Sequence, residues 1–187
     1  MRFFLFYLYL VMAFPAQATA IENTSEGFFE IKSAKTYLKD DRYFLNADVD
    51  YELSDESIRA LKNGIVLTLI LQVDIVKERW YLWNEKVANS TYHYVLRYHP
   101  LSNYYVVSQI SQNKTYVFPN LTDLLTTLGS FREIPLLAKQ LLSGDQTYQV
   151  RLQTYLDIEA LPPSLRTVAY FSREWRLISD TFSCSLE

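Results

Sequence analysis

Residues 45–53 read LNADVDYEL, and this stretch decides the fold class. Apolar side chains stand at every second position, with Asn46, Asp48, Asp50 and Glu52 between them. Because successive side chains of a strand point to opposite faces, the alternation predicts a half-buried β-strand. The acidic row of Asp48, Asp50 and Glu52 has two interpretations, a cation site or the solvated face of the strand. We expect the solvated face, which is common in antiparallel sheets.

Other stretches of strand type lie on both sides of residues 45–53, and turn-forming residues separate them. We expect strands at residues 27–38, 65–77, 90–98, 104–110, 114–118, 147–157 and 170–182, the last being a strand pair or one bent strand. Seven to nine strands at hairpin spacing predict a mainly β fold. The favoured architecture is an antiparallel β-sandwich of immunoglobulin-like type, and a closed β-barrel is the alternative.

Three short helices are expected beside the strands. Ser54 can cap a helix over residues 55–62. Two more helices are predicted in an insertion at residues 119–143. The first, at 119–128, has leucines at helical spacing, and the second, at 135–142, begins with a proline.

Length and composition are those of one globular domain. The chain has 187 residues, of which 49% are hydrophobic and 21% are charged, which argues against disorder. We therefore expect a single domain over residues 21–187. The net charge is −3, and this mild acidity gives no support for nucleic-acid binding, which usually depends on a basic stripe.

The first twenty residues have the pattern of a cleavable signal peptide. Arg2 precedes an apolar run, FFLFYLYLVMAF at residues 3–14, which is shorter than the roughly 20 residues that cross a bilayer. Small residues then permit cleavage after Ala18 or after Ala20. We expect a protein exported to the periplasm of a Gram-negative bacterium, or secreted, with no membrane span after cleavage.

Chemistry-bearing residues are few. The two histidines, His93 and His99, are too far apart on one strand to share a metal ion. Cys184 is the single cysteine, so no intrachain disulfide can form; it is either a quiet thiol, which we favour, or an intermolecular bridge. No nucleophile, zinc or phosphate-loop motif occurs. The sequence predicts no catalytic residue, no metal site and no cofactor.

Aromatic side chains form the candidate partner surface. Exposed tyrosine and tryptophan are good anchors for a protein or a sugar, although core packing explains many of them. The candidate residues are Trp80, Tyr81, Trp83, Tyr104 and Tyr105.

The C-terminal third carries two segments, LPPSLR at residues 161–166 and SREWRL at residues 172–177. Two interpretations are open for them: a binding role, or a structural one with a stiff connection, a buried Trp175 and a surface pair of Arg173 with Glu174, and we favour the structural one. Together with LNA at 45–47, ALKNG at 60–64, Trp80 and YHPL at 98–101, they resemble a proteobacterial family of exported proteins of unknown function. Some members of that family are encoded beside a sensor histidine kinase of the nitrogen-regulation type. The resemblance implies a role as a periplasmic accessory to signalling and supplies no catalytic residue. The motif residues are Leu161, Pro162, Pro163, Arg166, Ser172, Glu174 and Trp175.

Three functions are therefore open. The first is a non-enzymatic binding module, whose partner is a membrane protein such as the periplasmic domain of a sensor kinase. The second is a carboxylate-based hydrolase that uses pairs from the row Asp48 to Glu52. The third is an envelope carrier that holds an apolar ligand between its sheets, in a cavity lined by leucine and tyrosine.

Overall fold

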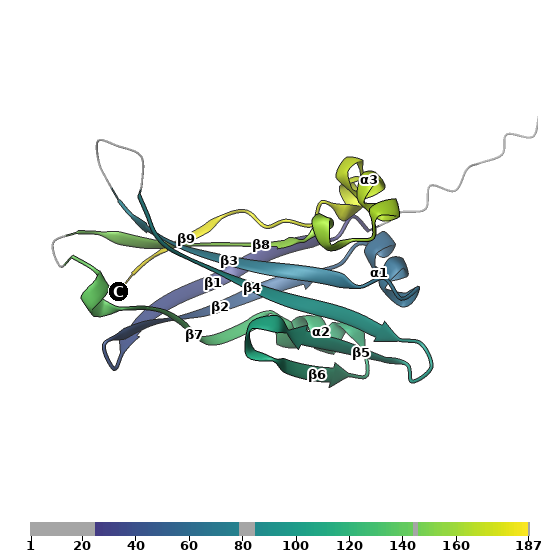
Figure 1. Cartoon of the computed structure of the whole chain (residues 1–187), viewed down its shortest axis with the longest axis horizontal. Coiled ribbons are helices and arrows are strands. Elements are labelled where there is room, and N and C mark those ends of the chain that lie inside the picture. The colour runs from purple at the N-terminus through teal and green to yellow at the C-terminus, as the bar shows by residue number, and fades with distance from the viewer. Residues whose placement is uncertain (1–24, 79–84, 144–145, 187) are drawn as a thin grey trace, which may run out of the picture.

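Two stacked antiparallel sheets form the fold of the computed structural model, which describes residues 25–78, 85–143 and 146–186 (Figure 1). One sheet has three strands in the order β1-β2-β7, and the other has six in the order β6-β5-β4-β3-β8-β9. The strands are β1 (Phe28–Lys39), β2 (Arg42–Glu52), β3 (Leu67–Lys77), β4 (Glu85–His99), β5 (Tyr104–Gln109), β6 (Lys114–Phe118), β7 (Ser130–Ala138), β8 (Tyr148–Leu156) and β9 (Phe182–Ser185). The helices are α1 (Asp55–Lys62), α2 (Leu121–Leu128) and α3 (Pro163–Phe171), with short 3₁₀ turns η1 (Ile110–Gln112), η2 (Lys139–Leu141), η3 (Ile158–Ala160) and η4 (Arg173–Trp175).

This architecture confirms the predicted β-sandwich, and the sheets do not close into the alternative barrel. The likeness to immunoglobulin domains is limited to the two packed sheets, because the strands divide three and six rather than four and three.

The predicted alternation along residues 45–53 is present in β2. Leu45 and Leu53 are 0% and 2% exposed, whereas Asp50 lies on the solvent side. The hairpin from β1 to β2 turns at Asp40 and Asp41, both of which have left-handed backbone angles. Such a two-residue turn matches the twist of the strands, so this part of the sheet is specified locally.

The core lies between the sheets and is centred on β3, which pairs with β4 on one side and β8 on the other. A polar link crosses this core. The hydroxyl groups of Tyr51 and Thr154 are 2.9 Å apart, and Thr154 Oγ1 also donates to the carbonyl of Ile70 at 2.9 Å. Burial raises the pKa of Tyr51, so this phenol stays neutral and the link joins β2 to β8 without a buried charge.

The two long sides of the sandwich differ. On one side β1 and β9 are neighbours, and Thr36 Oγ1 donates to the carbonyl of Ser185 at 2.9 Å. On the other side the edge strands β7 and β6 are bridged by α2, which contacts both of them. The groove and the cleft described below both lie on this second side, next to α2.

Three parts of the sequence prediction were wrong in detail. Residues 135–142 are not a helix, because Pro135 lies within edge strand β7 and only the 3₁₀ turn η2 follows it. The third helix is instead α3, which begins at Pro163, so LPPSLR is the start of a helix rather than a stiff connection. Residues 170–182 contain the end of α3 and the turn η4, and only Phe182 belongs to a strand.

Within the described residues, no helix is long and apolar enough to span a membrane. The candidate residues Trp80, Tyr81 and Trp83 fall outside them, as do the residues of the predicted signal peptide.

Candidate functional site

The candidate site is where β7 separates from β2. The last paired residues of these two strands are Asp48 and Ser130. Beyond that pair, one further hydrogen bond runs from the N–H of Val49 to the carbonyl of Gly129 at 2.8 Å. Gly129 directly follows α2 in the chain and is the C-cap of that helix. The last part of β2 therefore faces a helix instead of a strand.

This part of β2 has an unpaired edge at Tyr51. In an antiparallel ladder the N–H and C=O groups of alternate residues point to the same neighbour. Because the N–H of Val49 points to the β7 side, the backbone groups of Tyr51 also point there, towards α2. Among the described residues, neither group of Tyr51 has a hydrogen-bond partner on that side.

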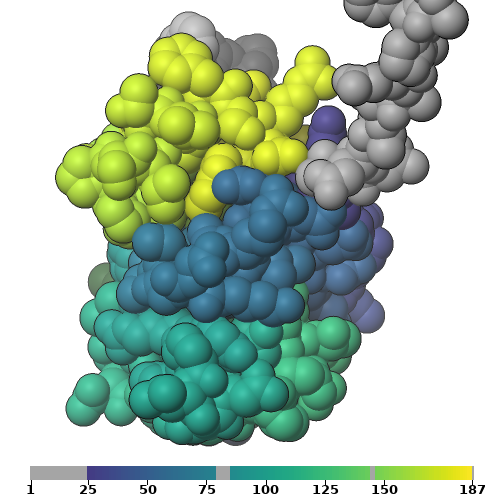
Figure 2. All heavy atoms as spheres, turned by 90° about the vertical axis from the view of Figure 1, so that its right-hand side faces the viewer, coloured from purple at the N-terminus to yellow at the C-terminus, as the bar shows by residue number. Residues whose placement is uncertain are grey.

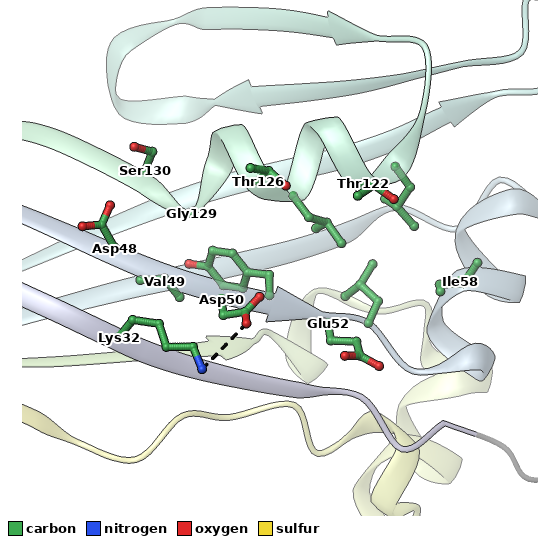
Figure 3. A pocket seen from close by; sticks show the side chains of 14 residues that line it. Lys32, Asp48, Val49, Asp50, Glu52, Ile58, Thr122, Thr126, Gly129 and Ser130 are labelled. Carbon is green, nitrogen blue, oxygen red and sulfur yellow. Dashed lines mark ion pairs between the residues drawn. The ribbon is translucent and has the colours of Figure 1, made fainter.

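A groove of about 640 Å³ runs along this edge (Figure 3). Its floor is the edge of β2, and its apolar walls come from Ile58 of α1 and from Leu121 and Leu125 of α2. In Figure 3, Thr122 and Thr126 of α2 stand across the groove from the acidic row of β2. The groove is long, open and apolar at its base.

The acidic row borders this groove. Asp48 accepts hydrogen bonds from Arg132 at 2.6 Å and from Ser33 at 3.0 Å, and these bonds hold the pKa of Asp48 below its usual value. Asp50 lies 3.8 Å from the ammonium group of Lys32, and Glu52 accepts a bond from Ser25 at 3.2 Å. The row is thus solvated, as expected, and it also forms a negative rim.

Chemically, this rim suits electrostatic attraction more than proton transfer. A carboxyl group that acts as a general acid needs a raised pKa, and that of Asp48 is lowered. Neither a histidine nor a cysteine is among the described residues that line the groove. Within the described chain, no cluster of three or more histidine, cysteine, aspartate or glutamate residues could hold a metal ion.

The aromatic surface predicted from the sequence lies elsewhere. Tyr105 is buried against Tyr98, with ring centroids 4.8 Å apart, and Tyr104 packs at 4.9 Å from the exposed His99. Trp80, Tyr81 and Trp83 lie outside the described residues. The described members therefore serve packing on the β4–β5 hairpin and do not reach the groove.

The family-motif residues gather at one end of the sandwich, where α3 and η4 lie beside α1 (Figure 2). Leu161 and Trp175 are each 1% exposed, as predicted for the tryptophan. Arg166 donates back to the carbonyl of Leu161 at 3.0 Å and lies 3.4 Å from Glu159. The other members start α3 at Pro162 and Pro163, end it at Ser172, and continue into η4 with Glu174.

These contacts give the motif a structural role at the end of the molecule. The expected surface pair of Arg173 with Glu174 is not among the ion pairs of the described residues. His93 and Cys184 are half-buried on β4 and β9, far from each other in the sheet order.

Sequence reasoning missed the contribution of α2 to the site. The leucine spacing indicates the helix, but its position beside β2 depends on contacts between distant segments. Gly129 was the available signal. A Cβ at this position would lie 2.0 Å from the carbonyl oxygen of Val49, so glycine permits the close approach that leaves the groove open beyond it.

The fold and the groove define the structural class of the protein, which is a two-sheet β-sandwich with an unpaired strand edge at the base of a groove. The chain belongs to the family described as Domain of unknown function (DUF4390), which matches residues 27–185. No curated protein is significantly similar to the chain, and no solved structure matches it.

Proposed function

We propose that this protein is an exported, non-enzymatic binding module that takes an extended segment of a partner protein into the groove between β2 and α2. The observation that carries this proposal is the unpaired backbone of Tyr51 at the base of an apolar groove. A partner strand that adds to such an edge gains main-chain hydrogen bonds, and pockets for alternate side chains select its sequence.

The lining of the groove suggests the chemistry of that segment. Apolar side chains of the partner would pack on Leu121 and Leu125, while basic ones would meet Asp50 and Glu52. Among the described residues, those that line the groove and carry charge are three acids and Lys32, so the net charge of the rim favours a cationic segment. Opposite charges on facing strands contribute roughly 0.2–1 kcal/mol per pair.

What supports a binding role over the carboxylate hydrolase is the state of the acidic row, since Asp48 is held ionised by Arg132. The proposed location is the periplasm, on the grounds of the signal-like residues 1–20. The proposed partner is a membrane protein, and the family resemblance suggests the periplasmic domain of a sensor kinase. Fractionation that left the chain in the cytoplasm with Met1 intact would overturn the location.

The test is site-directed photocrosslinking in the native envelope. A photoreactive amino acid replaces Thr126, an exposed groove residue, and crosslinked partners are identified by mass spectrometry. We expect one reproducible membrane partner, and we expect the double variant Asp50→Lys, Glu52→Lys to lose it.

The matched control is Asp180→Lys, which changes charge in the same sense at an exposed residue outside the groove. This variant should keep the crosslink. Absence of any partner, or equal crosslinking by the rim and control variants, would refute a groove that binds through its acidic rim.

A further inference from the structure

A second cleft opens between the two sheets on the side bridged by α2. It has a volume of about 330 Å³ and is lined from the six-stranded sheet by β4, β5 and β6 and from the other sheet by β7. This volume lies at the low end of the range for small-molecule sites. The cleft can therefore hold a small aromatic ligand.

Aromatic side chains contribute to both walls of the cleft, and they are Tyr92, Tyr94, Tyr116, Phe118 and Phe131. The rings of Tyr94 and Phe131 contact each other across the sheets, with centroids 5.7 Å apart and planes tilted by 59°. Such walls favour a planar aromatic guest, because rings prefer offset or edge-to-face contacts with other rings.

Tyr94 supplies a polar handle inside this cleft. The residue is only 8% exposed, yet its hydroxyl group makes no hydrogen bond with any described residue. The hydroxyl oxygen is also not among the completely buried polar atoms that lack a partner, so it is not fully shielded from solvent. A buried tyrosine usually finds a partner for this group. Burial raises the pKa of Tyr94, so the group remains a neutral phenol that can donate to or accept from a ligand.

The charges around the cleft select the sign of the ligand. Arg132 is bound to Asp48 at 2.6 Å, and Glu133 is bound to Lys39 at 3.3 Å. Lys114 makes no ion pair within the described residues, although it lines the cleft and is exposed. The available charge is therefore positive.

A bulge in β7 shapes the same wall. Residues three apart on a regular strand face opposite sides, but Phe131 and Ile134 are both buried and both line the cleft. The bulge between them makes this possible, with Glu133 at φ +51° and its N–H bonded to Asn46 Oδ1 at 2.9 Å. Bulges and left-handed backbone outside glycine are frequent at functional sites.

We propose that this cleft binds a small planar aromatic anion, with its ring packed against the touching rings of Tyr94 and Phe131 and its negative group at Lys114. The cleft shares Ser130 with the groove along β2 but has its own aromatic lining, and its ligand does not depend on the partner proposed there. It also gives the carrier function, one of the three functions open from the sequence, a specific ligand class.

The test uses two fluorescent probes that share one ring system. 8-Anilinonaphthalene-1-sulfonate is an anion, and N-phenyl-1-naphthylamine is its uncharged counterpart. We expect the anion to bind the folded protein at one saturable site and more tightly than the neutral probe. Lys114→Gln should weaken the binding of the anionic probe about tenfold, the effect expected when a hydrogen bond to a charged group is lost. The affinity for the neutral probe should stay unchanged.

Two further variants separate this cleft from other apolar surface. Tyr94→Phe removes only the hydroxyl group and should weaken the anionic probe. Phe171→Ala removes a side chain that is 87% exposed on α3, and it should change neither probe. Equal binding of both probes, no effect of Lys114→Gln and Tyr94→Phe, or loss of binding in Phe171→Ala would each overturn the proposal.

Discussion

Gly129 shows how a single residue controls the distance between α2 and β2. A Cβ here would lie 2.0 Å from the carbonyl oxygen of Val49, and both elements would have to shift. Overpacking of this kind costs about 1–3 kcal/mol. We therefore expect Gly129→Ala to lower the free energy of unfolding in urea by that amount. Ser130→Ala, at the exposed neighbouring residue, should change it by less than about 0.5 kcal/mol, and equal effects of the two variants would contradict the close approach.

Single residues were predictable where the cause is local. Ser54 accepts a hydrogen bond from the first turn of α1, and Asp48 and Asp50 lie on the solvated face of β2 because of the two-residue period. That the same carboxylates border a groove could not be read from the sequence. It depends on the residue at which β7 stops pairing with β2, and contacts between residues far apart in the sequence determine that position.

At the scale of an element, the pairing of β3 with β4 carries a pH-dependent contribution. Burial opposes ionisation of Asp74, but hydrogen bonds from Lys86 at 2.8 Å, from Asn89 and from Gln72 outweigh it, and the pKa of Asp74 is lowered. A lowered folded-state pKa stabilises the fold above the unfolded pKa of about 3.9, and this stabilisation is lost as pH falls through the folded value.

Asp74→Asn should therefore lower the free energy of unfolding at pH 7 by up to about 1 kcal/mol, a modest amount because Lys86 is half exposed. At pH 2 the difference should disappear. Urea unfolding at both pH values measures it, with Asp180→Asn as the exposed control. The same loss at pH 2 as at pH 7 would show that the carboxylate charge is not responsible.

Prolines account for the elements that the sequence pattern misplaced. Pro135 resembles the first residue of a helix, but β7 is an edge strand that pairs only with β2, and an edge tolerates a residue without an N–H. The pair Pro162 and Pro163 suggests an extended linker, yet Pro163 is the first residue of α3. Proline is favourable in both settings, so tertiary position decides between them.

The end formed by α3 and η4 depends on Trp175, which is 1% exposed and lies in the turn that contacts α1. Replacing such a side chain by alanine removes its transfer free energy and leaves a cavity, which costs about 3–5 kcal/mol. We expect Trp175→Ala to lower the free energy of unfolding by that amount. Phe171→Ala, on exposed α3 surface, should have little effect, and comparable losses would mean that Trp175 is not an anchor of this end.

For the whole molecule, α2 is the element around which both proposed sites are arranged. Leu121, Thr122, Leu125 and Thr126 line the groove, whereas Thr127 and Leu128 line the cleft between the sheets. On the opposite side β1 and β9 are joined by the bond from Thr36 to Ser185, so both proposed sites lie on the side bridged by α2. The sequence indicates the sandwich through strand number and alternation, but the difference between its two sides arises only when distant strands become neighbours.

The same connectivity predicts a single folding unit. One hydrophobic core takes residues from both sheets and from all three helices, and the buried bond between Tyr51 and Thr154 joins the sheets at its centre. Residues 21–187 should unfold in urea as one cooperative transition, because neither sheet can keep the apolar side chains of its inner face buried without the other sheet. Far-UV circular dichroism, which follows the strands, and tryptophan fluorescence, which includes Trp175 at one end, should give the same midpoint. A separate early loss of fluorescence would show that α3 and η4 unfold independently of the sandwich.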